Sequence, residues 1–168
     1  MAHLKIPTAY DRTKVLLVDD EPEHLGWFID YLKAKGLTAD VRTNVRDALD
    51  AIESLTYRAY IVDLTIPLGE WIPNLGARSG AFNDYHGLYV LQLVRSQGNS
   101  GGLVVAYSVH NNEQVAAEIK RLYCGYVAKG RPLEFKREVE QILKKERKPK
   151  KRAVKHAGKK SRKRAGKR

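Results

Sequence analysis

The sequence contains a single cysteine, Cys124, among its 168 residues, which excludes an internal disulfide. No group of cysteine and histidine residues has the spacing of a zinc site, and no apolar run reaches the length of about 18 residues that a membrane span needs. The first residues, MAHLKIPTAYDRTK, lack the apolar centre of a signal peptide. These absences predict a soluble protein of the reducing cytoplasm that makes no contact with a membrane.

Acidic residues are almost absent from residues 144–168, where 15 lysine and arginine residues accompany one glutamate. That segment carries a formal charge of +14, whereas residues 1–143 hold 16 basic and 18 acidic side chains. Because the segment has few apolar residues and its charges repel one another, we expect it to be disordered in isolation. The chain is therefore divided into an N-terminal extension (1–13), one domain (14–143) and a basic tail (144–168).

Residues 14–143 alternate between short apolar runs and helical patterns. The predicted strands are residues 15–18, 37–41, 60–64, 103–107 and 125–128. The first helix opens at Glu21-Pro22 and stops at Gly36, and Thr43 or Asn44 caps the second. The last helix has its apolar positions at Leu133, Phe135, Val139, Ile142 and Leu143. Five strand–helix units in succession favour an α/β fold, a parallel sheet with helices on both faces.

The alternation is interrupted by an insertion at residues 65–86, after the third strand. It is rich in glycine and proline and contains two turn-like pieces, Ile66–Glu70 and Asn74–Gly80. A connection of this length in a compact domain is unusual and often functional. Its large apolar side chains predict that it packs against the domain; they are Trp71, Ile72, Leu75 and Phe82.

Each of four predicted strands ends in polar residues of a particular kind. Asp19 and Asp20 follow the first strand, Asp63 the third, Ser108 the fourth and Lys129 the fifth. Because the carboxyl ends of parallel strands share one edge of the sheet, these side chains are expected to converge. Three carboxylates, a hydroxyl and an ammonium group suit metal-assisted phosphoryl transfer to an aspartate.

Mg²⁺ prefers oxygen ligands from one or two carboxylates, phosphate and water. Asp20 and Asp63 are predicted as direct ligands, Asp19 as the holder of a metal-bound water, and the carbonyl of Thr65 as a further ligand. Lys129 would pair with phosphoryl oxygens as a point charge. Taken alone, Asp19-Asp20 would be as well explained by capping of the following helix at its positive end.

The segments VLLVDDEP, VDLTIP, GLYVLQLVR, VVAYS and CGYVAKGRP, in that order, resemble the receiver domain of bacterial two-component response regulators. The resemblance covers roughly residues 14–143. It implies a flavodoxin-like sheet, phosphorylation at Asp63, an acidic pocket of Asp19 and Asp20, and switch positions at Ser108 and Tyr126. For Tyr126 the alternative is simple core packing.

The resemblance further implies a histidine kinase or phosphotransfer protein as partner, allows a homodimer, and makes the chain a phosphoryl acceptor rather than an enzyme. Two departures stand out. The segment after Asp63 is longer than in the usual receiver, and the usual Lys-Pro pair is spread out as Lys129-Gly130-Arg131-Pro132.

The tail points to a second kind of partner. Its charge density suits nucleic acid, and the absence of aromatic residues that could stack on bases predicts that such binding is nonspecific and salt-dependent. The alternatives are another polyanion or an acidic protein as the partner, or a solvated extension with no specific partner. The alternative for the whole chain is a polyanion-binding architectural protein with an unphosphorylated receiver fold; a phosphate-ester hydrolase is a third, weaker hypothesis. The candidate tail contacts are Lys150, Lys151, Arg152, Lys159, Lys160, Arg162, Lys163 and Arg164.

Overall fold

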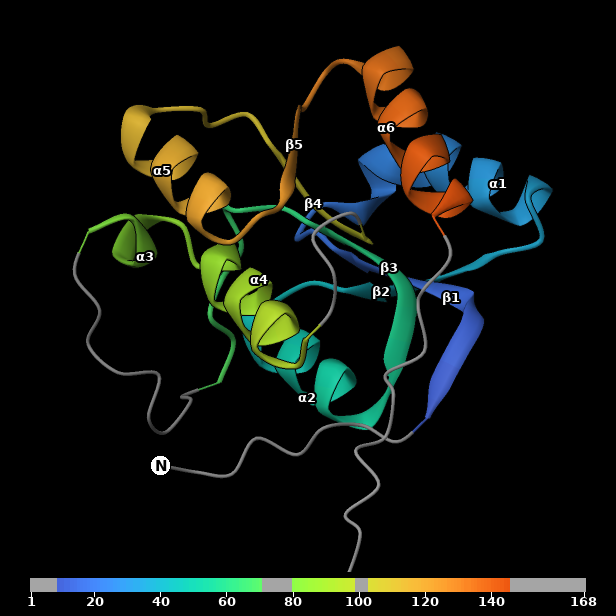
Figure 1. Cartoon of the computed structure of the whole chain (residues 1–168), viewed down its shortest axis with the longest axis horizontal. Coiled ribbons are helices and arrows are strands. Elements are labelled where there is room, and N and C mark those ends of the chain that lie inside the picture. Colours follow the sequence, from blue (N-terminus) through green and yellow to red (C-terminus); the bar gives the residue numbers. More distant parts are fainter. Residues whose placement is uncertain (1–8, 71–79, 99–102, 146–168) are drawn as a thin grey trace, which may run out of the picture.

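The structure is a computed structural model that describes residues 9–70, 80–98 and 103–145 (Figure 1). Five parallel strands form one sheet in the order β2-β1-β3-β4-β5, which is the flavodoxin-like order. The predicted fold class is therefore confirmed. The strands are β1 (Tyr10–Val18), β2 (Thr38–Arg42), β3 (Thr56–Val62), β4 (Val104–Ser108) and β5 (Gly125–Ala128).

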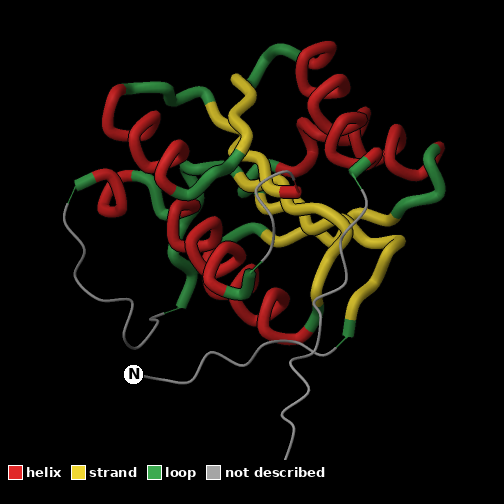
Figure 2. The backbone as a smooth tube through the Cα atoms, in the orientation of Figure 1, coloured by secondary structure: helices red, strands yellow, loops and turns green. Residues whose placement is uncertain are grey.

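Helices cover both faces of the sheet, so that the strands form the middle layer (Figure 2). One face carries α1 and α6, and the other carries α2, α4 and α5 (Figure 1). The helices are η1 (Pro22–Leu25), α1 (Gly26–Ala34), α2 (Val45–Ser54), α3 (Ala81–Asp84), α4 (Gly87–Ser96), α5 (Glu113–Arg121) and α6 (Pro132–Lys144), of which η1 is a 3₁₀ helix.

The continuous apolar runs become strands because both of their faces are covered. In β1, Leu16 and Val18 join the core under α2, α4 and α5, while Val15 and Leu17 join the core under α1 and α6. Two helices begin where an asparagine side chain accepts the N–H three residues ahead: Asn44 from Asp47 and Asn112 from Val115. Asn44, rather than Thr43, is thus the cap of α2.

Two strands and the last helix differ from the prediction. β1 starts at Tyr10 and β3 at Thr56, upstream of their most apolar residues, because Tyr10 and Asp11 pair with Thr56 and Tyr57 before a register shift. Leu133 was predicted as an apolar core position, and that was wrong: its side chain is 71% exposed. The inner face of α6 comprises Phe135, Val139 and Ile142, whose spacing follows the helical repeat.

The described parts of the insertion pack against the domain. Residues 66–70 contain no helix or strand, but the carbonyls of Pro67 and Leu68 accept the N–H groups of Val45 and Arg46 in the first turn of α2. Phe82 on α3, a helix that the sequence did not predict, is buried with its ring centroid 5.0 Å from that of Tyr89. The predicted packing of Trp71, Ile72 and Leu75 lies outside the described residues.

No helix within the described ranges is long and apolar enough to cross a membrane.

The start of α4 lies directly against the end of β3. The N–H of Gly87 donates to the carbonyl of Leu64 at 3.0 Å. A Cβ atom on Gly87 would stand 2.0 Å from the carbonyl oxygen of Asp63 and 2.8 Å from the Cα of Leu64. Both neighbours are backbone atoms, so an added methyl group can be accommodated only by moving the strand end that carries Asp63.

We predict that Gly87→Ala lowers the free energy of unfolding by about 3 kcal/mol, because the methyl group overpacks a rigid contact. Gly26→Ala is the matched control, since nothing lies within 4 Å of a Cβ there and alanine favours the helix. Urea unfolding followed by circular dichroism measures both. Equal stability of the two variants would contradict the close approach of α4 to β3.

Candidate functional site

Three carboxylates meet at the carboxyl edge of the sheet, where the sequence places them. Asp19 and Asp63 follow β1 and β3, and their N–H groups extend the strand ladders to the carbonyls of Arg42 and Val18. Ligand oxygens of Asp19, Asp20 and Asp63 all lie within 4.8 Å of one another. Asp19 and Asp63 are 1% and 5% exposed, whereas Asp20 faces solvent. The cluster is therefore buried on one side and accessible on the other.

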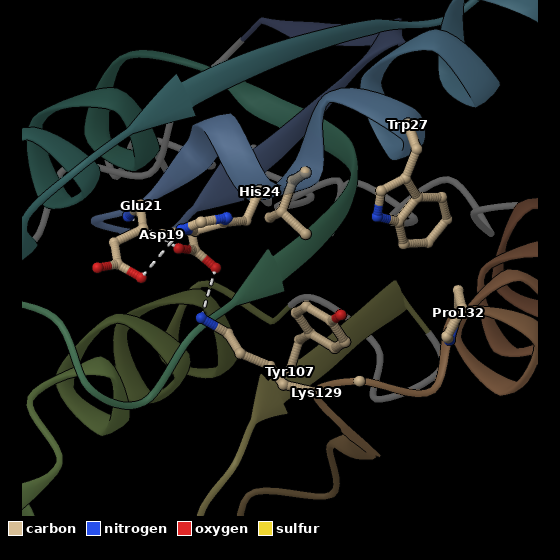
Figure 3. A pocket seen from close by; sticks show the side chains of 9 residues that line it. Asp19, Glu21, His24, Trp27, Tyr107, Lys129 and Pro132 are labelled. Carbon is tan, nitrogen blue, oxygen red and sulfur yellow. Dashed lines mark hydrogen bonds and ion pairs between the residues drawn. The ribbon is translucent and has the colours of Figure 1, made fainter.

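Lys129, directly after β5, joins the two buried carboxylates. Its Nζ lies 2.7 Å from Oδ2 of Asp63 and 2.8 Å from Oδ2 of Asp19 (the latter contact is drawn in Figure 3). Burial, the largest influence, lowers the pKa of Lys129, but the adjacent carboxylates of Asp19 and Asp63 together outweigh it and raise that pKa. The ammonium group therefore stays charged, and it neutralises one of three carboxylates.

The second oxygen of each buried carboxylate is held by the backbone. Oδ1 of Asp19 accepts the N–H of Glu21 at 3.0 Å, and Oδ1 of Asp63 accepts the N–H of Thr65 at 3.2 Å. Such bonds to the N–H two residues ahead fix a turn after each strand. Both Oδ2 atoms are left to face each other across Lys129.

The donor set fits Mg²⁺. All ligand candidates are oxygens, the cluster keeps a net negative charge beside Lys129, and Asp20 is open to water. Oδ2 of Asp19 is buried, and although it lies at ion-pair distance from Lys129 it receives no hydrogen bond of good geometry. That oxygen has capacity for a further positive partner. The N–H of Thr65 donates to the Asp63 carboxylate, and ligation of a metal by the Thr65 carbonyl stays a prediction.

Ser108 ends β4 and is completely buried. Its hydroxyl accepts the N–H of His110 at 3.3 Å, and its carbonyl accepts the N–H of Lys129 and the hydroxyl of Tyr126, both at 3.0 Å. Ser108 thus links the strand that carries Lys129 to the loop before α5. Tyr126 is partly buried, and burial raises the pKa of its phenol. Tyr126 packs against the core and its hydroxyl donates to the Ser108 carbonyl, and its role as a switch stays a prediction.

Two tyrosines near the site were missed from the sequence. Tyr107 on β4 lies beside Lys129 and lines a cavity of about 290 Å³ between η1, α1 and the start of α6 (Figure 3). Tyr85, from the insertion, accepts a hydrogen bond from Nδ2 of Asn112 at 2.8 Å, and its ring centroid is 5.2 Å from that of His110. The sequence did offer one indication of the position of Tyr107. Successive side chains of a strand point to opposite faces of the sheet, so Tyr107 must lie on the face opposite Ser108.

Cys124 is mostly buried, and burial raises the pKa of its thiol to about 11. Because the thiolate is the reactive form, this agrees with packing rather than redox chemistry. The predicted nucleic-acid contacts of the tail, from Lys150 to Arg164, lie outside the described residues.

Known proteins resemble this chain in structure and not in sequence. No family model matches it, and no curated protein matches it. The non-phosphorylated HemR receiver domain of Leptospira biflexa superimposes with a TM-score of 0.63 at 14% identity, covering 80% of this chain and 97% of that one. This chain has the receiver fold.

Two further receivers support that assignment. A CheY-like response regulator receiver domain protein from Methanospirillum hungatei JF-1 gives a TM-score of 0.60 at 15% identity, covering 78% of this chain and 93% of that one. The response regulator TrrA of Thermotoga maritima, in complex with Mg(2+)-BeF, gives 0.56 at 21% identity, covering 77% and 98%. The acidic cluster and Lys129 occupy the carboxyl edge of this receiver fold.

We predict that Mg²⁺ stabilises the folded protein through the acidic cluster. At about 100 times its Kd, a ligand that binds only the folded state raises the free energy of unfolding by about 2.7 kcal/mol. Asp20→Asn should abolish most of this gain, because it removes the exposed carboxylate of the cluster. Urea unfolding with and without MgCl₂ measures this change in the free energy of unfolding for each variant.

Asp30→Asn is the matched control, since Asp30 is an exposed acid on α1 that pairs with Lys33 at 3.3 Å. It should keep the full Mg²⁺ effect. A Mg²⁺ effect of the same size in Asp20→Asn and wild type would show that the ion binds elsewhere.

Proposed function

We propose that the protein is a response regulator that accepts a phosphoryl group on Asp63 from a histidine kinase or a phosphotransfer protein. One observation carries this proposal: the ammonium of Lys129 lies between Asp63 and Asp19, beside Asp20, at the carboxyl edge of a receiver fold. An architectural scaffold has no use for buried carboxylates, which are costly to desolvate.

In the proposed reaction, a carboxylate oxygen of Asp63 forms a bond to phosphorus. The bond from phosphorus to the donor, a histidine nitrogen of the partner, breaks, and the imidazole leaves with its electron pair. The fixed turn at Thr65 and the contact with Lys129 hold the carboxylate ready, which reduces the entropic part of the barrier. The chain is the substrate of this transfer and needs no general base, because Asp63 reacts as the carboxylate.

Charge compensation falls to Lys129 and to Mg²⁺. Lys129 is within reach of oxygens placed on Asp63 and remains charged there. Mg²⁺, held by Asp20 and Asp63 and through water by Asp19, would neutralise the phosphoryl oxygens. The negative charge of the cluster is the reason that the ion is needed, since carboxylates alone would repel a phosphate.

Ser108 and Tyr126 are proposed to transmit the new charge. The Ser108 hydroxyl, now held by the N–H of His110, would donate to the phosphoryl group, and Tyr126 would follow because it is bonded to the Ser108 carbonyl. The affected surface is that of α5, β5 and α6. A bistable element biased by a local charge is the general form of such a switch.

Acetyl phosphate with Mg²⁺ is expected to add one phosphoryl group, about 80 Da, to the wild-type protein and nothing to Asp63→Asn, because the amide cannot form the acyl phosphate. Intact mass spectrometry measures the adduct. Asp30→Asn serves again as the control and should be phosphorylated as wild type.

A short-lived adduct is distinguished from an inactive site by titrating the protein with beryllofluoride in the presence of Mg²⁺, followed by fluorine NMR. Absence of both the adduct and beryllofluoride binding in the wild type would reject phosphorylation at Asp63. The architectural hypothesis would then take its place.

The tail supports a second proposal, that the protein binds nucleic acid or another polyanion without sequence preference. Residues 144–168 carry a charge of +14. Their starting point is fixed: Arg58 on β3 donates hydrogen bonds to the carbonyls of Leu143 and Lys145 at the end of α6. Arg58 precedes Asp63 by five residues, roughly 17 Å along the strand. The tail therefore leaves from the edge opposite the acidic cluster.

We expect duplex DNA of unrelated sequences to bind equally, with an affinity that falls about 10³-fold or more between 50 and 200 mM salt if 6 or more phosphates are neutralised. Removal of residues 146–168 should abolish binding. Fluorescence anisotropy at several salt concentrations measures the slope, and affinity that does not change with salt would refute this electrostatic account.

A further inference from the structure

Lys129 has a long side chain with several rotatable bonds, yet its ammonium group must stay between two carboxylates. The residue after it gives no stiffness, because Gly130 adopts a φ of +85° that glycine reaches without strain. No peptide bond in the described residues is cis, and Pro132 comes two positions later. The group that holds Lys129 in place must therefore come from another element.

Besides the two carboxylates themselves, the ring of Tyr107 is in position to do this. Nζ of Lys129 lies 5.8 Å from the centroid of the Tyr107 ring, within the range of a cation–π contact. Tyr107 pairs with Val127 in the sheet, and Lys129 follows two positions later, so the Lys129 side chain starts two residues nearer the carboxyl edge and its ammonium group reaches the Tyr107 ring. Figure 3 shows Tyr107 next to Lys129 at the cavity wall.

The Tyr107 ring is itself firmly held. It is 5% exposed, and its centroid is 4.2 Å from that of Phe135 on α6. Phe135 is fully buried and lies 4.5 Å from Phe28 on α1. The ring beside Lys129 therefore rests on an aromatic stack that joins β4 to both helices of this face.

The hydroxyl of Tyr107 reaches the turn that follows Lys129. Burial, the main influence, raises the pKa of this phenol, while the backbone N–H of Gly130 acts on the hydroxyl in the opposite direction. Because the residue after Lys129 is glycine and not proline, its backbone N–H is available as a hydrogen-bond donor. Tyr107 thus contacts Lys129 with its ring and acts on the Gly130 turn with its hydroxyl.

We propose that Tyr107 is a positioning residue for the phosphorylation of Asp63: its ring and hydroxyl fix Lys129 and the Gly130 turn so that the ammonium is already in place when the phosphoryl group arrives. This inference rests on the proposed function. The adjoining cavity needs no ligand of its own in this account, since Asp19 and Lys129 in its wall belong to the acidic site.

The test compares rates of phosphorylation by acetyl phosphate at saturating Mg²⁺, followed by intact mass at a temperature where circular dichroism shows every variant folded. Tyr107→Leu removes ring and hydroxyl and is expected to slow phosphorylation about tenfold, as loss of supporting contacts commonly does. Tyr107→Phe keeps the ring and removes only the acceptor of the Gly130 N–H, with an expected loss of about threefold.

Phe28→Leu is the packing control. It removes a buried ring from the same aromatic stack, one step further from Lys129 and with no contact to it. A residue that merely fills the core would slow phosphorylation no more than this control does. We expect Phe28→Leu to lower the stability and to keep the wild-type rate within about twofold, because neither Lys129 nor the Gly130 turn loses a partner.

The proposal is overturned if Tyr107→Phe reacts as fast as wild type and Tyr107→Leu as fast as Phe28→Leu. Should Tyr107→Leu fail to fold, the rate of Tyr107→Phe decides alone, and a wild-type rate rejects the proposal. Failure of the proposed function looks different: the wild type itself then takes up no phosphate and binds no beryllofluoride. In that case the role of Tyr107 falls with it.

Discussion

Two buried carboxylates face each other at the carboxyl edge of the sheet, and the positive charge of the Lys129 ammonium offsets the repulsion between them. Asp19 and Asp63 would repel strongly in a poorly solvated place, and Lys129 lies within 2.8 Å of both. The parallel sheet serves this arrangement, because only strands that run the same way bring the ends of β1, β3 and β5 to one edge. The compensation is incomplete, and the remaining negative charge is the basis of the predicted affinity for Mg²⁺.

The surroundings of Lys129 extend this constraint into both layers of helices. On the face of α1 and α6, the Tyr107 ring connects it to Phe135 and the aromatic stack. On the other face, the Ser108 carbonyl is shared by the Lys129 N–H and the Tyr126 hydroxyl. The loop beyond Ser108 is then tied to the insertion through Asn112 and Tyr85. Asp63 is thus connected through Lys129 to elements on both sides of the sheet.

The parallel sheet and the convergence of Asp19, Asp63 and Lys129 could be predicted from the sequence, since they follow from apolar periodicity and from the geometry of parallel sheets. The strand order was implied only by the resemblance to receiver domains. The failures had physical causes. Leu133 is apolar but stands on the outer face of α6, where only the register of Phe135 and Val139 reveals its exposure. Alternation along β4 places Tyr107 on the face opposite Ser108, but it does not reveal the contact of the Tyr107 ring with Lys129, because that side chain comes from the neighbouring strand. The short helix α3 is held by the burial of Phe82, and its four residues are too few for a periodic signal.

The anchoring of α6 by Arg58 gives the molecule two unlike poles. The acidic cluster marks one edge of the sheet, and the basic residues begin at the other. If the tail binds a polyanion as proposed, the field of that polyanion would orient the protein with the end of α6 leading. A domain tethered in that way would present Asp63 to the surrounding solvent, so occupancy of the tail and access of a phosphoryl donor would not compete for the same side of the protein.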